Sequence, residues 1–211
     1  DITSVAEDAD GALWFGMDGS GLSRFKDGQW ETWAVGKGPA SNVIGLIVED
    51  GAGNIWAIVG EGGGVGRYNP TTDAWKTFAE ENGALDWPGV LAVDRKGQVW
   101  IGGWASVRFF DGERWHPIES DALGEYNVWA ITQDVSGAMW FGTEVNIIRY
   151  NPDDGSTQVF TTSDGLPEGE TYQLSSAPDG LIVANVNGKL VVFDGTHWRL
   201  QFPDRQIDQI T

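Results

Sequence analysis

Short runs in which apolar and polar residues alternate recur along the whole chain. Each run spans about four to seven residues, and the breaks between runs contain Gly, Asp, Asn or Pro. A period of two residues indicates half-buried β-strands, and no stretch of about ten or more residues has the period of an amphipathic helix. The pattern therefore predicts an all-β chain.

One of these runs occurs in four closely similar copies. They read GALWFG at residues 11–16, GNIWAI at 53–58, GQVWIG at 97–102 and GAMWFG at 137–142. Their tryptophans, 42, 44 and 40 residues apart, are Trp14, Trp56, Trp100 and Trp140. A fifth copy, GLIVAN, places Val183 in the same column. The chain therefore contains an internal repeat with a period of about 42 residues.

A second column, which precedes an aromatic residue, has the same phase. It contains Arg24, Arg67, Arg108 and Arg149, and we align Val191 with them in the fifth copy. We expect both columns to be structural. The indole rings fill the space between neighbouring sheets, and each guanidinium stacks on an aromatic ring or bonds a turn carbonyl.

The order of signals within each copy predicts four strands. The first turn reads DADG, DGAG, DRKG, DVSG or APDG, which suits a type I turn, and the last contains DG or NP. Four strands in about 42 residues form the blade of a β-propeller. We expect one propeller domain over residues 1–211, with four-stranded antiparallel blades at 1–41, 42–86, 87–126, 127–169 and 170–211.

Two of the copies, VAEDADGALWFGMDGSGLSRF and AITQDVSGAMWFGTEVNIIRY, resemble the two-component regulator propeller repeat. The resemblance covers all five copies and is weakest in LSSAPDGLIVANVNGKLVVF, which lacks both Trp and Arg. It implies a propeller of seven blades that acts as the extracytoplasmic sensor domain of a two-component system and detects oligosaccharides. It therefore implies a periplasmic or extracellular location. More distantly, the repeat is similar to that of streptogramin B lyase, a metal-dependent propeller enzyme.

The number of copies leaves two arrangements open. The five copies form either a closed five-bladed ring or part of a larger, seven-bladed propeller, and we favour the second. The final residues QIDQIT echo the opening DITSV, which predicts that a sixth copy begins there.

Charge and composition limit the partners. The chain has 31 acidic and 13 basic residues and a net charge of −18, which argues against nucleic acid and anionic membrane surfaces. The absence of cysteine excludes disulfides and thiolate metal sites. No apolar run is long enough to cross a membrane as a helix, so we expect no direct membrane insertion by this segment.

Few residues suit catalysis. His116 and His197 are expected in the last strand of a blade, whereas a lyase of the streptogramin type requires a histidine facing the channel. The Gly-rich segment 60–66 is not followed by a helix, as a phosphate-binding loop would be, and DADG lacks the remaining ligands of a calcium loop. We therefore predict no catalytic residues, no metal, no cofactor and no enzymatic activity.

Aromatic residues that depart from the repeat are the candidates for ligand binding. The position five residues before the turn Asp is Thr3, Gly45, Gly89, Trp129 or Tyr172, so two copies have a large aromatic ring there. In a propeller this position lies near the channel entrance, on the face that also presents the loops between second and third strands. The predicted ligand-binding residues are Trp87, Trp104, Trp129, Tyr172, Tyr126, Glu61, Glu144 and Asn146.

These observations favour a non-catalytic ligand-sensing propeller, the sensor part of a two-component signalling protein that binds a small molecule or oligosaccharide. Aromatic rings stack on the flat faces of sugars, and carboxylates fix their orientation. One alternative is a protein-interaction scaffold that docks a basic partner or self-associates. A third is a metal-dependent lyase. For any single aromatic residue, the alternative that it only seals a junction between blades also remains open.

Overall fold

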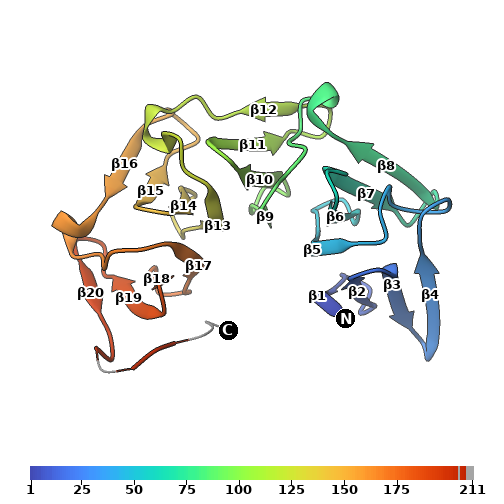
Figure 1. Cartoon of the computed structure of the whole chain (residues 1–211), viewed down its shortest axis with the longest axis horizontal. Coiled ribbons are helices and arrows are strands. Elements are labelled where there is room, and N and C mark those ends of the chain that lie inside the picture. Colours follow the sequence, from blue (N-terminus) through green and yellow to red (C-terminus); the bar gives the residue numbers. More distant parts are fainter. Residues whose placement is uncertain (204, 208–211) are drawn as a thin grey trace. The chain divides into compact units, whose positions relative to one another are not determined.

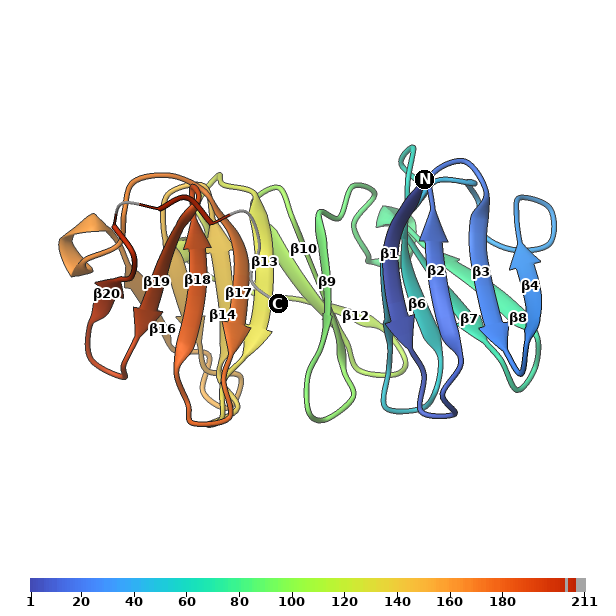
Figure 2. The same cartoon turned by 90° about the horizontal axis from the view of Figure 1, so that it is seen from below.

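The chain forms five four-stranded antiparallel sheets, each a blade of a β-propeller (Figure 1). A computed structural model describes residues 1–203 and 205–207, so Asp208–Thr211, in the tail predicted to begin a sixth copy, lie outside the described residues. Within each blade the strands pair in sequence order, which Figure 2 shows from a second direction. The all-β propeller prediction is confirmed.

The strands follow the predicted order in every copy. Blade 1 contains β1 (Ile2–Glu7), β2 (Leu13–Met17), β3 (Gly21–Lys26) and β4 (Gln29–Trp33). Blade 2 contains β5 (Ile44–Glu49), β6 (Ile55–Val59), β7 (Val65–Asn69) and β8 (Ala74–Phe78). Blade 3 contains β9 (Val90–Val93), β10 (Val99–Gly103), β11 (Ser106–Phe110) and β12 (Trp115–Pro117).

The last two blades repeat this arrangement. Blade 4 contains β13 (Val128–Gln133), β14 (Met139–Thr143), β15 (Ile147–Tyr150) and β16 (Thr157–Phe160). Blade 5 contains β17 (Thr171–Ser176), β18 (Ile182–Val186), β19 (Lys189–Phe193) and β20 (Trp198–Leu200). The helical segments in the described part of the chain are three single 3₁₀ turns, η1 (Glu80–Asn82), η2 (Asp121–Leu123) and η3 (Thr162–Asp164). None of the helices described is long and apolar enough to span a membrane.

Two compact units divide the chain within blade 3. Unit 1 comprises residues 1–101 and 108–117, and unit 2 comprises 102–107 and the residues from 118 onward. In unit 1 the first strands β1, β5 and β9 lie side by side, and in unit 2 β13 lies beside β17. The single domain expected over 1–211 stays a prediction.

The tryptophan column lies at the junctions between blades, as predicted. Trp14 is fully buried, and its ring centroid lies 5.6 Å from that of Tyr68 in blade 2. Trp56 lies 5.1 Å from Phe110 of blade 3 in the same way. Each ring therefore leaves its own sheet to pack on the next blade, which buries a large apolar surface and joins the two sheets.

The same junction occurs in unit 2, where Trp140 of blade 4 packs on blade 5. Its ring centroid lies 5.4 Å from that of Phe193 and 6.1 Å from that of Trp198. Ile182, Ala184 and Val191 complete the buried cluster. The repeated sequence motif thus corresponds to a repeated packing contact between a tryptophan and the next blade.

The first residue of each turn holds the indole ring in place. Hydrogen bonds join Trp14 Nε1 to Asp8 Oδ2 (2.8 Å), Trp56 to Asp50 (2.7 Å), Trp100 to Asp94 (3.0 Å) and Trp140 to Asp134 (2.9 Å). From the sequence, turn geometry alone accounts for this Asp. The structure shows that it also satisfies an indole N–H that would otherwise be buried unpaired.

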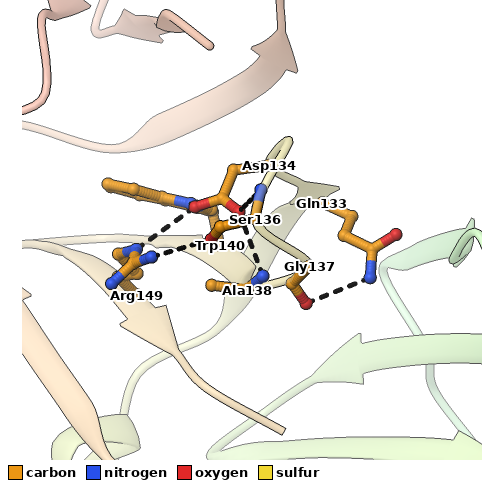
Figure 3. Close-up of polar contacts among 7 residues, drawn as sticks. All are labelled: Gln133, Asp134, Ser136, Gly137, Ala138, Trp140 and Arg149. Atoms are coloured by element: carbon orange, nitrogen blue, oxygen red, sulfur yellow. Dashed lines mark hydrogen bonds and ion pairs between the residues drawn. The ribbon is translucent and has the colours of Figure 1, made fainter.

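Blade 4 shows the most complete form of this unit (Figure 3). Asp134 Oδ1 accepts from the backbone N–H groups of Ser136 (2.8 Å) and Ala138 (3.0 Å), while Oδ2 accepts from Trp140 and from Arg149 Nε (3.2 Å). Arg149 Nη2 also donates to Ser136 Oγ (3.0 Å). The guanidinium carbon lies 5.8 Å from the Trp140 ring centroid, so one carboxylate joins turn, indole and arginine.

Arginine plays both of the predicted roles, in different blades. In blades 1 and 2 the guanidinium carbon of Arg24 lies 5.4 Å from the Trp14 ring centroid, and that of Arg67 lies 5.5 Å from the Trp56 ring centroid. In blade 3, Arg108 Nη1 instead donates to the carbonyls of Gly83 (2.7 Å) and Ala84 (2.9 Å) in the preceding connection.

The arginine column is displaced by one residue in blades 3 and 5, which corrects the sequence alignment. In blade 3 the ring stacked on Trp100, at 5.0 Å, is that of Phe109. In blade 5 the strand register pairs Val183 with Val192 and not with Val191. The last hairpin of these blades has one residue fewer before its Asp-Gly turn, and a shift of one residue moves a side chain to the other face of a sheet.

Trp56→Ala should lower the free energy of unfolding by about 3–5 kcal/mol, because it removes a buried ring from a blade junction. Trp30→Ala, which truncates an indole that is 60% exposed, should lower it by about 1 kcal/mol or less. Chemical denaturation of both variants and the wild type measures the difference. Equal losses of unfolding free energy in the two variants would show that the tryptophan column does not dominate stability.

Asp134→Asn should flatten the acid dependence of stability. Burial alone would raise the pKa of Asp134, but hydrogen bonds from Ser136, Trp140, Arg149 and Ala138 outweigh it, and the pKa is lowered from its ordinary 3.8. The unfolded chain therefore binds more protons in acid. The stabilisation is complete above about pH 4 and is lost as pH falls through the lowered pKa.

Unfolding free energies measured between about pH 2 and pH 6 test this expectation. The variant should be less stable than the wild type at neutral pH and should lose less stability on acidification. Asp18→Asn, at an exposed carboxylate, is the matched control and should keep the wild-type slope. Parallel slopes for Asp134→Asn and the wild type would contradict the assignment.

Candidate functional site

The predicted ligand-binding residues fall into two sets, one in each unit. Unit 1 contains Glu61 and Trp87. Unit 2 contains the remaining six, Trp104, Tyr126, Trp129, Glu144, Asn146 and Tyr172.

Three of the unit 2 residues are brought together by backbone and side-chain bonds. Trp104, in the β10–β11 loop, forms an isolated antiparallel bridge with Asn127, and Ala105 N donates to Tyr126 O (2.9 Å). Asn127 Nδ2 donates to Glu144 Oε1 (3.0 Å) in the β14–β15 loop. Trp104 is 63% exposed, and Tyr126 is also exposed. These bonds link the segments that carry two exposed aromatic side chains and the Glu144 carboxylate.

Trp129 and Tyr172 occupy β-bulges, where the register of the first strand shifts against the second. Thr3 and Gly45 occupy the bulges of blades 1 and 2, and Gly89 directly precedes β9. A bulged residue is unpaired, so the ladder does not fix which side chain stands there. This accounts for the variability of the column that the sequence singled out.

The two bulge aromatics differ in exposure. Tyr172 is 51% exposed, and its hydroxyl donates to Glu170. That hydrogen bond, together with some desolvation and the neighbouring negative charge, raises the pKa of Tyr172. Trp129 is half-buried, and its indole N–H is buried with no hydrogen-bond partner in the described part of the chain. Tyr172 is therefore open to a ligand, whereas Trp129 offers only part of its ring.

The side-chain oxygen and the backbone N–H of Asn146 form hydrogen bonds within the protein. The residue is buried, its Oδ1 accepts from Thr143 Oγ1 (2.9 Å), and its backbone N–H donates to the same hydroxyl oxygen (3.1 Å). These bonds close the β14–β15 loop that presents Glu144. The structure thus places Asn146 behind the loop surface, where it fixes loop shape.

In unit 1, the Trp87 side chain lies over the Gly-rich β6–β7 loop. Trp87 is 72% exposed, and a Cβ atom added to Gly62 would come within 3.1 Å of its ring. Gly62 also has a φ of 77°, so both the close approach and the backbone favour glycine. The adjacent Glu61 accepts from Ser41 Oγ (3.0 Å). Gly62 in this Gly-rich segment thus allows the close approach of the Trp87 ring.

Neither histidine lies on a first strand. His116 is in β12, where its Nε2 lies 2.6 Å from Asp111 Oδ2 and its ring stacks on Phe109 at 5.0 Å. His197 lies in the turn before β20, with Nδ1 3.0 Å from Thr196 Oγ1. Across the residues that the structure describes, no group of three or more His, Cys, Asp or Glu side chains is placed to hold a metal ion.

Solved structures of the same fold are of two kinds. The extracellular domain of the hybrid two-component system BT3049 from B. thetaiotaomicron is 25% identical, with a TM-score of 0.78, over 100% of this chain and 30% of its own. That of BT4673 from the same organism is 17% identical, with a TM-score of 0.72, over 99% and 28%. Virginiamycin B lyase from Staphylococcus aureus is 14% identical, with a TM-score of 0.78, over 100% and 71%.

These structures match the resemblance drawn from the repeat, which is confirmed for both the two-component sensor propellers and, more distantly, the streptogramin lyase type. The chain spans about 30% of the length of these two extracellular domains. Protein-family models and curated sequences give no match to the chain. The fold is thus that of a propeller whose structural neighbours include extracellular domains of signalling proteins.

Glu170→Gln should lower the pKa of Tyr172 toward its ordinary value of 10.0, because the carboxylate both accepts the phenol proton and repels the phenolate. Ultraviolet titration of the tyrosinates, compared with a Tyr172→Phe variant, isolates this group. The stabilising contribution of the neutral phenol is present below pH 10 and disappears as pH rises through the raised pKa. A titration curve of Glu170→Gln that matches the wild type would contradict the hydrogen bond between Tyr172 and Glu170.

Proposed function

We propose that the chain is a non-catalytic ligand-sensing module in the periplasmic or extracellular part of a signalling protein, and that its ligand is a neutral oligosaccharide. One observation supports this best. Trp104, Tyr126 and Tyr172 are exposed in unit 2 at loop and bulge positions that the repeat does not constrain. Exposed aromatic rings beside hydrogen-bonding groups are typical of sugar-binding surfaces.

The chemistry of these residues favours a neutral ligand. Aromatic rings contact the C–H faces of a sugar, and a carboxylate such as Glu144 accepts hydrogen bonds from its hydroxyl groups. The net charge of −18 disfavours anionic ligands. We assign stacking to Trp104, Tyr126, Tyr172 and the partly exposed ring of Trp129, and orientation to Glu144.

Asn146 supports the site by holding the loop that presents Glu144. Trp87 and Glu61 form a second proposed contact area within unit 1, on the Gly-rich loop. The comparisons support an extracellular sensor role because two of the structural neighbours are extracellular domains of two-component systems.

A protein-interaction scaffold is the second candidate, favoured by the excess of 31 acidic over 13 basic residues. A complex of that kind with a basic partner should weaken strongly as salt is added, whereas sugar stacking should be nearly insensitive to salt. The lyase alternative predicts turnover that a chelator abolishes.

A thermal-shift screen against neutral oligosaccharides tests the sensor proposal, because a ligand that binds only the folded state raises the melting temperature. We then expect Trp104→Ala and Tyr172→Ala each to weaken binding about tenfold, a loss of about 1.4 kcal/mol, with a small change in melting temperature. Isothermal titration calorimetry measures the affinities.

Trp30→Ala is the matched control, because Trp30 is as exposed as Trp104 but lies in unit 1 on a blade face. Its affinity should equal that of the wild type. Equal losses for Trp30→Ala and Trp104→Ala would contradict the assigned site. A cooperative melt with no shift for any sugar would favour the scaffold.

A further inference from the structure

The four arginines that precede an aromatic residue differ in their polar partners. Arg149 Nε donates to the turn carboxylate of its own blade (3.2 Å), as Figure 3 shows, and Arg24 Nη1 lies 3.5 Å from Glu31 Oε2. Arg108 donates to two backbone carbonyls. Arg67 of blade 2 has no hydrogen bond or ion pair with the residues that the structure describes. Its guanidinium therefore keeps its donors unused.

The residue after the first turn of blade 2 explains why Arg67 lacks the carboxylate partner found in blade 4. Asn54 stands where blade 4 has an alanine, and its Nδ2 donates to Asp50 Oδ2 (2.9 Å) and Oδ1 (3.1 Å). Trp56 Nε1 also donates to Oδ2 (2.7 Å), and two backbone N–H groups donate to Oδ1. The acceptor sites of the Asp50 carboxylate are thus filled by its own turn and by the indole.

The position opposite Arg67 on the last strand of the blade carries a second cation. The strand register pairs Arg24 with Glu31 in blade 1, but it pairs Arg67 with Lys76 in blade 2. Lys76 is exposed and also has no ion pair or hydrogen bond within the described part of the chain. Like charges directly opposite each other on a sheet are destabilising. Blade 2 therefore has two neighbouring cations where blade 1 has an ion pair.

Aromatic rings hold both cations at the junction of blades 2 and 3. The guanidinium carbon of Arg67 lies 5.5 Å from the ring centroid of Trp56 and 5.7 Å from that of Phe78. The ring centroid of Phe110 in blade 3 is 5.9 Å away. Lys76 Nζ lies 4.6 Å from the Phe78 centroid. Cation–π contacts position the two charges, and the apolar surroundings strengthen their attraction for an anion.

We propose that Arg67 and Lys76 form a binding site for a dianionic oxyanion, which is either free phosphate or the phosphate group of a monoester. A planar guanidinium can donate to two oxygens of such a group, and an ammonium can donate to a third. Two negative charges balance both cations, whereas a single carboxylate balances one. The inference goes beyond the ligand-sensing role and does not depend on it.

The net charge of −18 disfavours anions over the molecule as a whole but does not decide binding at this site. At physiological ionic strength, charges more than about 8 Å apart are largely screened in solvent. The contacts within the site therefore dominate. In the described part of the chain, no carboxylate pairs with Arg67 or Lys76 to compete with a bound anion.

Isothermal titration calorimetry with inorganic phosphate tests the proposal, with sodium chloride at the same ionic strength as the blank. The wild type should bind one phosphate. Lys76→Glu recreates the Arg–Glu pair of blade 1 and should weaken binding about tenfold or more. Lys189→Glu makes the same charge change at an exposed lysine of unit 2, and its affinity should stay within about twofold of the wild type.

The melting temperature provides a readout that needs no ligand. In phosphate-free buffer, Lys76→Glu should melt about one or two degrees above the wild type, because an ion pair replaces a repulsion. An unchanged or lower melting temperature would contradict the unpaired state of Arg67 and overturn the proposal.

Two further ligands complete the titrations. Glucose 6-phosphate distinguishes the sources, since tighter binding than inorganic phosphate indicates a monoester and weaker binding indicates the free ion. Acetate should bind much more weakly than phosphate. Acetate binding as tight as that of phosphate, equal losses for Lys76→Glu and Lys189→Glu, or no phosphate binding by the folded wild type would each overturn the proposal.

Discussion

The hydrogen bond from a buried indole N–H to the Asp of the preceding turn is the interaction that blades 1 to 4 share, and the described junctions between blades depend on it. A tryptophan supplies more apolar surface than any other side chain, but its N–H must be satisfied when it is buried. Asp8, Asp50, Asp94 and Asp134 do this while also accepting turn amides. In blades 1, 2 and 4 the turn within the blade and the contact with the next blade are therefore stabilised by the same carboxylate. The last-strand tryptophans Trp115 and Trp198 have no such partner among the described residues.

This repeated unit leaves other positions free to vary. Loops between second and third strands and the bulges of first strands contribute little to blade packing, so they tolerate rings as exposed as those of Trp104 and Tyr172. Buried tryptophans join blades, whereas the exposed aromatics are the residues that we propose for ligand binding.

Much of the fold could be predicted from spacing, because a period of about 42 residues and the Trp column depend on features many residues long. Features that depend on a shift of a single residue could not be predicted in this way. The displacement of Arg108 and Val191 from the arginine column follows from hairpin length, and a single-residue shift reverses the face of a side chain. The sequence singled out Trp129 and Tyr172 but gave no sign that they occupy bulges. It also could not show that Asn146 is committed to Thr143, because that contact depends on loop closure.

The most direct measurement is a double-mutant cycle between Asp50 and Trp56, made with Asp50→Ala, Trp56→Phe and the double variant in chemical denaturation. If the carboxylate acts through the indole N–H, the two substitutions are coupled by about 1–3 kcal/mol. A coupling near zero, with additive losses, would show that the Asp serves only its turn and would contradict the account.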